Sequence, residues 1–142
     1  MTALLSSFDH VQLAMPVGGE DAARAFWVGL LGFIERPKPA SLAARGGAWF
    51  DGGAVVVHVG GETPFAPARK AHPAFRVGSI DALASRFAAA GYPVRWDTEI
   101  PDLRRFHVDD PFGNRLECVS DGTEPAAVPS APDPHGGYTV AS

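Results

Sequence analysis

The sequence has a single cysteine, no long apolar run and no cluster of basic residues, and each shortage excludes a class of protein. Cys118 cannot form a disulfide within the chain, which excludes a small disulfide-stabilised scaffold. No stretch approaches the roughly 20 apolar residues that cross a bilayer, so we expect no membrane association. The 12 Lys and Arg residues are spread thinly over a chain of net charge −4, so nucleic acid is not an expected partner.

The first ten residues, MTALLSSFDH, lack the basic start and the apolar run of a secretory signal. With only one cysteine, this favours a reducing, cytoplasmic location. At 142 residues, of which 46% are hydrophobic and 20% charged, the chain can bury one hydrophobic core without help from disulfides or structural metal ions. We therefore expect a single domain over residues 1–122. Residues 123–142 hold four prolines and little periodicity, and we interpret them as a C-terminal tail.

The first half of the chain alternates strand and helix signals. Residues 8–15 alternate in side-chain type, which predicts a strand with His10 and Gln12 on the face away from the apolar row. Apolar residues at helical spacing then follow over 23–31, so a helix can cover the apolar face of that strand. Two further strands are predicted over 47–51 and 54–60.

The second half repeats this order. A strand is predicted over 71–77, with His72 and Arg76 on the face away from the apolar side chains. Ser79 is a suitable N-cap for a helix whose apolar stripe covers 80–88. Two more strands are predicted over 104–109 and 114–120, joined by the turn sequence DPFG.

His10 and His72 stand at the start of the two units, 62 residues apart. The units, over residues 6–60 and 71–122, predict a pseudo-symmetric α+β domain whose two small sheets close around a cleft. Equivalent positions then face each other across the cleft. Glu117 alternates with apolar neighbours in the last strand, which places it on the same face. We therefore expect His10, His72 and Glu117 to converge.

Two imidazoles and one carboxylate suit a divalent metal with open positions for a substrate or water, such as iron, manganese, zinc or nickel. Glu117 would act chiefly as a ligand, and a carboxylate that leaves the metal could also move a proton. The competing interpretation is that each histidine is an ordinary solvated or hydrogen-bonded side chain.

Four segments together resemble a known superfamily. They are FDHVQLAM at 8–15, AFWVGLLGF at 25–33, HPAFRV at 72–77 and DPFGNRLE at 110–117. Over roughly residues 8–120 the chain resembles the vicinal oxygen chelate superfamily, which includes glyoxalase I, fosfomycin-resistance proteins, bleomycin-resistance proteins and extradiol dioxygenases. The resemblance implies two βαβββ modules that form a curved mixed sheet around a metal site, usually completed as a homodimer. It also implies His10, His72 and Glu117 as the metal ligands.

The resemblance leaves a fourth ligand open. Glyoxalase I enzymes supply one more ligand from the last strand of the first module. One spacing between the modules sets Val56 opposite Glu117, and another sets His58 there. Val56 would leave three ligands, whereas His58 would permit four. We favour three ligands, with His58 lining the substrate site.

Further polar side chains share the predicted cleft face by strand alternation. The residues that we expect to bind substrate are His58, Gln12, Arg76, Arg115 and His107, with Arg105 as an additional candidate. A cationic rim would favour an anionic or vicinal-oxygen substrate, since guanidinium groups hold carboxylates and phosphates.

The sequence is compatible with three functions. The first is a metalloenzyme of lyase, dioxygenase or thiol-transferase type that acts on a small vicinal-oxygen molecule through Lewis-acid chemistry. The second is a metal-free binding protein of the bleomycin-resistance type that stacks a drug-like molecule on Trp49, Phe50 and Phe106. The third is a structural dimer with a vestigial site.

Overall fold

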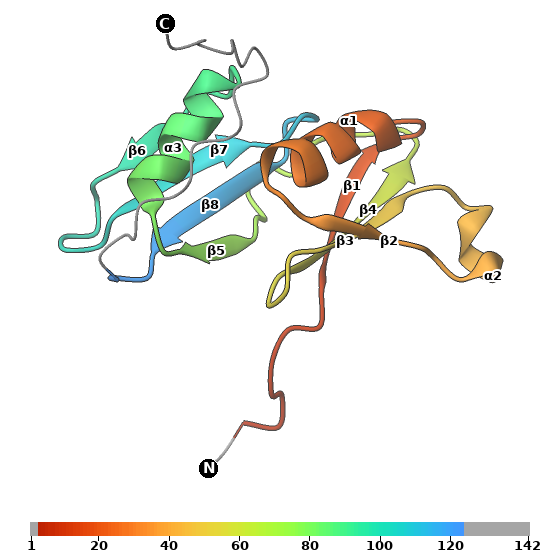
Figure 1. Cartoon of the computed structure of the whole chain (residues 1–142), viewed down its shortest axis with the longest axis horizontal. Coiled ribbons are helices and arrows are strands. Elements are labelled where there is room, and N and C mark those ends of the chain that lie inside the picture. The colour runs from red at the N-terminus through yellow and green to blue at the C-terminus, as the bar shows by residue number, and fades with distance from the viewer. Residues whose placement is uncertain (1–2, 124–142) are drawn as a thin grey trace, which may run out of the picture.

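The computed structural model describes residues 3–123 and consists of two modules with the same order of elements (Figure 1). The first module contains β1 (Val11–Pro16), α1 (Glu20–Arg24), the π-helix η1 (Ala25–Leu30), β2 (Ile34–Arg36), α2 (Ala40–Ala43), β3 (Ala48–Asp51) and β4 (Val56–Glu62). The second contains β5 (Ala74–Val77), α3 (Ile80–Ala89), β6 (Arg95–Asp97), β7 (Arg105–Asp109) and β8 (Arg115–Ser120).

Each module forms a four-stranded mixed sheet. The strand orders are β1-β4-β3-β2 and β5-β8-β7-β6, so the first strand of each module pairs in parallel with its fourth. The other neighbours are antiparallel hairpin pairs. This identical order confirms the predicted α+β fold of two pseudo-symmetric βαβββ modules.

The helices cover one face of each sheet, as the apolar stripes predict. Phe26 and Trp27 of η1 and Phe87 of α3 are each 1% exposed. The rings of Phe26 and Phe87 stack with centroids 5.8 Å apart, so the helical layers of the two modules share one core. The other sheet face is left for polar side chains.

Asn114 ties the two modules together at the end of β1. Its side-chain Nδ2 donates to the backbone oxygen of Ala14 at 2.8 Å, and its Oδ1 accepts from the backbone N–H of Ala68 at 2.9 Å. Asn114 is 1% exposed, so its side chain is shielded from water, while its bonds to the two backbone partners are only partly buried. Asp110 closes the turn by accepting the backbone N–H groups of Phe112 and Asn114, and burial raises the pKa of its carboxyl group.

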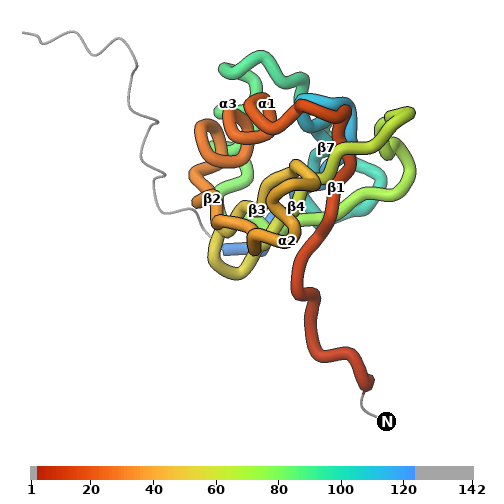
Figure 2. Tube along the Cα trace, turned by 90° about the vertical axis from the view of Figure 1, so that its right-hand side faces the viewer, coloured from red at the N-terminus to blue at the C-terminus, as the bar shows by residue number. Residues whose placement is uncertain are grey.

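Several boundaries differ from the sequence-based expectation. The strand β1 begins at Val11, and the N-terminal part of the described chain before it extends away from the body of the protein (Figure 2). The short elements β2, α2 and β6 were not identified by periodicity. Ser79 precedes α3 but makes no side-chain capping hydrogen bond to the helix. Except for Thr123, the proposed tail over 123–142 lies outside the described residues.

Within residues 3–123, none of the helices has the length and apolar character that a membrane span requires.

Candidate metal centre

The strand registers match the two modules position by position. Gln12 pairs with His58 in the first sheet, and Ala74 pairs with Glu117 in the second. Gln12 and Ala74 each follow a histidine by two residues, so His10 corresponds to His72 and His58 corresponds to Glu117. The register therefore favours His58 over Val56 as the counterpart of Glu117.

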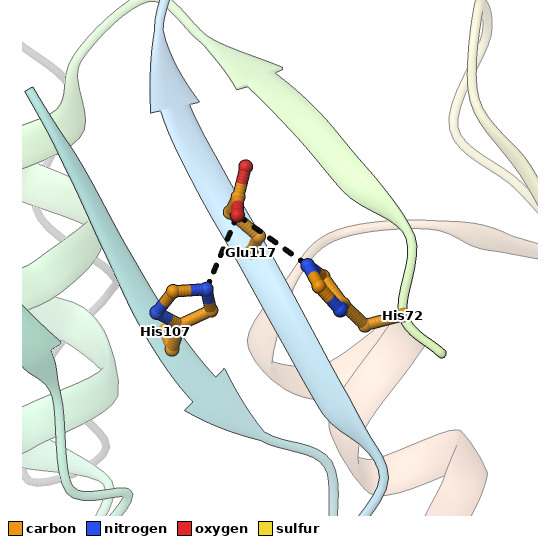
Figure 3. Close-up of side chains that lie close together, drawn as sticks. All are labelled: His72, His107 and Glu117. Carbon is orange, nitrogen blue, oxygen red and sulfur yellow. Dashed lines mark hydrogen bonds and ion pairs between the residues drawn. The ribbon is translucent and has the colours of Figure 1, made fainter. Parts of the chain in front are cut away.

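In the second module, three potential ligands gather on the sheet face that α3 does not cover (Figure 3). The Oε1 atom of Glu117 lies 3.4 Å from Nε2 of His72 and 3.1 Å from Nε2 of His107. One ligand atom from each residue lies within 4.8 Å of the others. His107 and Glu117 are direct cross-strand partners on β7 and β8, while His72 reaches the pair from the chain just before β5.

A positively charged side chain, that of Arg105, also contacts this group. Arg105 donates from Nη1 to Oε1 of Glu117 at 3.2 Å and from Nη2 to Oδ2 of Asp97 at 3.1 Å. The backbone N–H of Glu99 and then Arg105 lower the pKa of the Asp97 carboxyl group. The side chain of Glu117 is 12% exposed, so its charge is largely shielded from water and is balanced by these neighbours.

The hydrogen bonds of His72 determine which ring nitrogen can bind a cation. Its Nδ1 lies 2.7 Å from the backbone oxygen of Lys70, and a carbonyl oxygen only accepts, so Nδ1 carries the proton. In the neutral ring, Nε2 then presents a lone pair toward Oε1 of Glu117. Two acceptors 3.4 Å apart can both bind one proton or one cation. The same arrangement, with the second nitrogen held by a carbonyl, is usual for metal-binding histidines.

His10 has the corresponding tautomer in the first module but different neighbours. Its Nδ1 lies 2.8 Å from Oδ2 of Asp9, which leaves Nε2 without the proton in the neutral ring. The ring stacks on His58 with centroids 4.0 Å apart, and His58 stacks on Trp49 at 4.5 Å. Burial and the adjacent His10 lower the pKa of His58. Among the described residues, His10 does not join the group around Glu117.

A cavity of about 630 Å³ lies between the two modules, beside β1 and β5. His10 and Gln12 line it from the first module and His72 lines it from the second. Val56 is also a lining residue, whereas His58 is covered by its stacked neighbours. The cavity lies in the size range of small-molecule sites, about 300–1,000 Å³.

The other residues that the sequence predicts for the substrate site do not lie together. Arg76 is an exposed residue of β5 and lines a different, smaller cavity. Arg115 begins β8, where it pairs with Asp109 across the hairpin. Phe50 and Phe106 are each fully buried in the core, so the expectation that they stack against a bound molecule is wrong. Their strand alternation already places them on the helix-covered faces.

Asp97 was not predicted from the sequence, and His107 was predicted only as a substrate-binding residue. Asp97 lies in β6, a three-residue strand without a recognisable alternation. The position of His107 could have been found by counting outward from the turn, since Asp109 pairs with Arg115 and His107 therefore pairs with Glu117.

Comparisons with known proteins agree with this architecture. A profile described as Glyoxalase/Bleomycin resistance protein/Dioxygenase superfamily matches residues 7–118. No curated protein gave a significant match. A crystal structure of a glyoxalase family protein from Bacillus anthracis is 46% identical, with a TM-score of 0.79, and the match covers 84% of this chain and 98% of that one.

More distant solved structures share the fold. A FosX fosfomycin resistance protein variant from Listeria monocytogenes, complexed with Mn(II) and a dihydroxypropylphosphonic acid, is 16% identical with a TM-score of 0.68, covering 82% of this chain and 93% of that one. TnmS3, an antibiotic binding protein from Streptomyces sp. CB03234, is 21% identical with a TM-score of 0.61, covering 82% and 98%. From the profile match and the Bacillus anthracis relative, this chain belongs to the Glyoxalase/Bleomycin resistance protein/Dioxygenase superfamily.

Proposed function

We propose that this protein is a glyoxalase-like metalloenzyme that acts on a small substrate with two adjacent oxygen atoms. The observation that carries the proposal is the pair of His72 Nε2 and Glu117 Oε1, 3.4 Å apart, with the tautomer of His72 fixed by the Lys70 carbonyl. A divalent cation between these atoms would satisfy both lone pairs at once.

The donor set fits such an ion. Imidazole nitrogen and carboxylate oxygen are suitable ligands for zinc, iron, manganese and nickel. His72 and Glu117 would hold the metal, and His10, which lines the same cavity as His72, would supply a third ligand either from the same chain or from a second copy of it. His107 lies 3.1 Å from Glu117 Oε1 and is the alternative third ligand. The bound metal would supply Lewis acidity toward the paired substrate oxygens.

The residues around this group suggest how a substrate is held. Gln12 lines the cavity beside His10, where its amide can donate to or accept from a substrate oxygen. Arg105 contacts Glu117 and is itself anchored by Asp97, so its guanidinium fixes one carboxylate oxygen in place. We propose that Arg115 contributes positive charge on the same face of β8, which would favour an anionic substrate.

The metal content of purified protein tests this proposal. We expect close to one divalent metal per chain in the wild type, measured by inductively coupled plasma mass spectrometry. His72→Ala and Glu117→Gln should fall below about one tenth of that content, because each removes a ligand. His10→Ala and His107→Ala then decide which histidine is the third ligand.

His135→Ala is the matched control, since it removes an imidazole that is not among the proposed ligands. It should retain the wild-type metal content. Circular dichroism must show that each variant is folded. Full metal occupancy in folded His72→Ala and Glu117→Gln would rule out the proposed centre.

A metal-free binding protein is the second candidate, and one observation favours it. Glu117 is already balanced by Arg105, so the group is electrostatically complete without an ion. The stacked rings of His10, His58 and Trp49 would then offer an aromatic surface beside the cavity. The antibiotic binding of TnmS3 is consistent with this use of the fold.

Titration of the chelated protein with planar aromatic antibiotics separates the two candidates. A binding protein should bind with unchanged affinity after the metal is removed, and Trp49→Leu should weaken that binding. A metalloenzyme should instead lose turnover on chelation and recover it when the metal is returned. Assays with methylglyoxal plus thiol, catechol plus oxygen and fosfomycin plus thiol then sort the reaction class.

A further inference from the structure

A second cavity, of about 290 Å³, lies on the side of β8 opposite Glu117. Leu116 and Cys118 contribute to its wall, and both alternate with Glu117 along the strand. Phe75 of β5 and Leu83 of α3 also line it. The cavity therefore belongs to the helix-covered layer between the modules and is separated by the sheet from the proposed metal centre.

The wall of this cavity includes a buried donor that lacks a partner. Trp27 is 1% exposed, and its indole Nε1 has no hydrogen-bond partner among residues 3–123. A buried indole N–H normally pairs with an acceptor, because the group has given up its bond to water. The other polar lining residue, Arg76, is exposed, so the interior of the cavity is apolar apart from Trp27 and the thiol of Cys118.

The local backbone is also unusual. Trp27 lies within η1, a six-residue π-helix, and such turns occur frequently at functional sites. The backbone oxygen of Trp27 accepts from the N–H of Phe33 at 2.9 Å, which fixes the end of this turn. The indole is therefore held on a defined scaffold, between the rings of Phe26 and Phe33.

We propose that this cavity is a second binding site for a small apolar molecule, with one hydrogen-bond acceptor that pairs with Nε1 of Trp27. An engineered apolar cavity of about 150 Å³ holds benzene, and ordinary ligand pockets begin at about 300 Å³. A volume near 290 Å³ thus accommodates one or two rings. The acceptor would be a carbonyl or ether oxygen, since the cavity interior offers no group to balance a buried charge.

Two isosteric probes test the site on the full-length wild-type protein. Acetophenone carries a carbonyl oxygen where α-methylstyrene carries a methylene group, so the pair differs chiefly in the acceptor. In ¹H–¹⁵N spectra, the three indole N–H signals can be assigned with Trp27→Phe, Trp49→Phe and Trp96→Phe. We expect acetophenone to move the Trp27 signal downfield and to bind about tenfold more tightly than α-methylstyrene. The Trp49 and Trp96 signals should stay in place.

The variant Trp27→Phe keeps an aromatic wall but removes the donor. It should bind the two probes with equal affinity. The proposal is overturned if acetophenone at its solubility limit leaves the Trp27 signal unmoved, or if the wild type binds both probes equally. These comparisons do not involve the metal, so their failure would leave the proposed function of the other cavity intact.

Discussion

Glu117 and Cys118 are neighbours in sequence with opposite environments. Glu117 contacts two histidines and Arg105, whereas Cys118 lies in the core and is 3% exposed. Burial, and to a lesser degree the adjacent Glu117, raise the pKa of the Cys118 thiol to about 12. The thiolate is the reactive form, so this side chain is suited to packing and not to nucleophilic chemistry.

This environment predicts that Cys118 resists alkylation in the folded protein. Iodoacetamide at pH 8 should label less than about a tenth of the chains in an hour, because a thiol with a raised pKa is almost fully protonated there. Labelling should be complete in denaturant, where the ordinary thiol pKa returns. Intact mass spectrometry measures both states, and rapid labelling without denaturant would show that Cys118 is accessible.

At the level of single residues, the sequence is sufficient to place His72 and Glu117 on one face, because strand alternation determines the side that a residue occupies. It does not predict that His10 stacks on His58, since ring positions depend on side-chain torsions and on neighbours from other strands. Asp97 is likewise invisible in the sequence, because its role arises only when β6 pairs with β7.

At the level of elements, Asn114 connects the β7–β8 turn to both the first module and the linker. Its side chain makes three hydrogen bonds, to Ala14, Ala68 and Asp110, and it is almost completely buried. The segment DPFGNRLE at 110–117, one of the four that resemble the superfamily in sequence, therefore has a structural function. It closes a turn and holds β1 against the second module.

Replacement of Asn114 by alanine should lower the free energy of unfolding by about 2–4 kcal/mol, because it removes a buried side chain and the part-buried hydrogen bonds to Ala14 and Ala68. Urea denaturation followed by circular dichroism measures the change. Thr123→Ala removes a hydroxyl that bonds only at the surface, to Asp121, and serves as the control with an expected loss below about 0.5 kcal/mol. Equal losses in the two variants would contradict the assigned role of Asn114.

The elements that the sequence predicts well are those with long, regular patterns. The stripe over 80–88 becomes α3 within one residue at its end, and the alternation over 104–109 becomes β7. By contrast, β2 and β6 are three residues long, too short for any period to be recognised. The π-helix η1 differs from the predicted α-helix only in its hydrogen-bond spacing, which side-chain patterning does not report.

At the level of the whole molecule, several apolar features remain open to solvent. Leu4, Leu5 and Phe8 on the extended N-terminal arm are 89–100% exposed, and β1 and β5 are edge strands of their sheets. Exposed apolar patches and open strand edges are typical of interaction surfaces. We propose that a second copy of the chain covers them, and that His10 of one subunit then reaches the His72–Glu117 pair of the other.

A mixing experiment tests this shared site. His10→Ala and His72→Ala proteins should each lack metal, and refolding them together should restore about a quarter of the wild-type content, because half of the dimers are mixed and each has one intact site. Refolding each variant alone is the control. Light scattering should report a dimer throughout. If no metal returns in a dimeric mixture, the histidines act within one chain.

Metal binding by His72 and Glu117 is tested best by anomalous diffraction from crystals of the protein grown with Mn²⁺ or Zn²⁺. We expect one strong peak per chain, about 2.0–2.2 Å from Nε2 of His72 and from a carboxylate oxygen of Glu117. The Arg105 guanidinium contacts Oε1 of Glu117 without the metal, so it should shift toward the other carboxylate oxygen when the metal binds. Crystals that bind metal elsewhere, with His72 and Glu117 still in direct contact, would contradict this expectation.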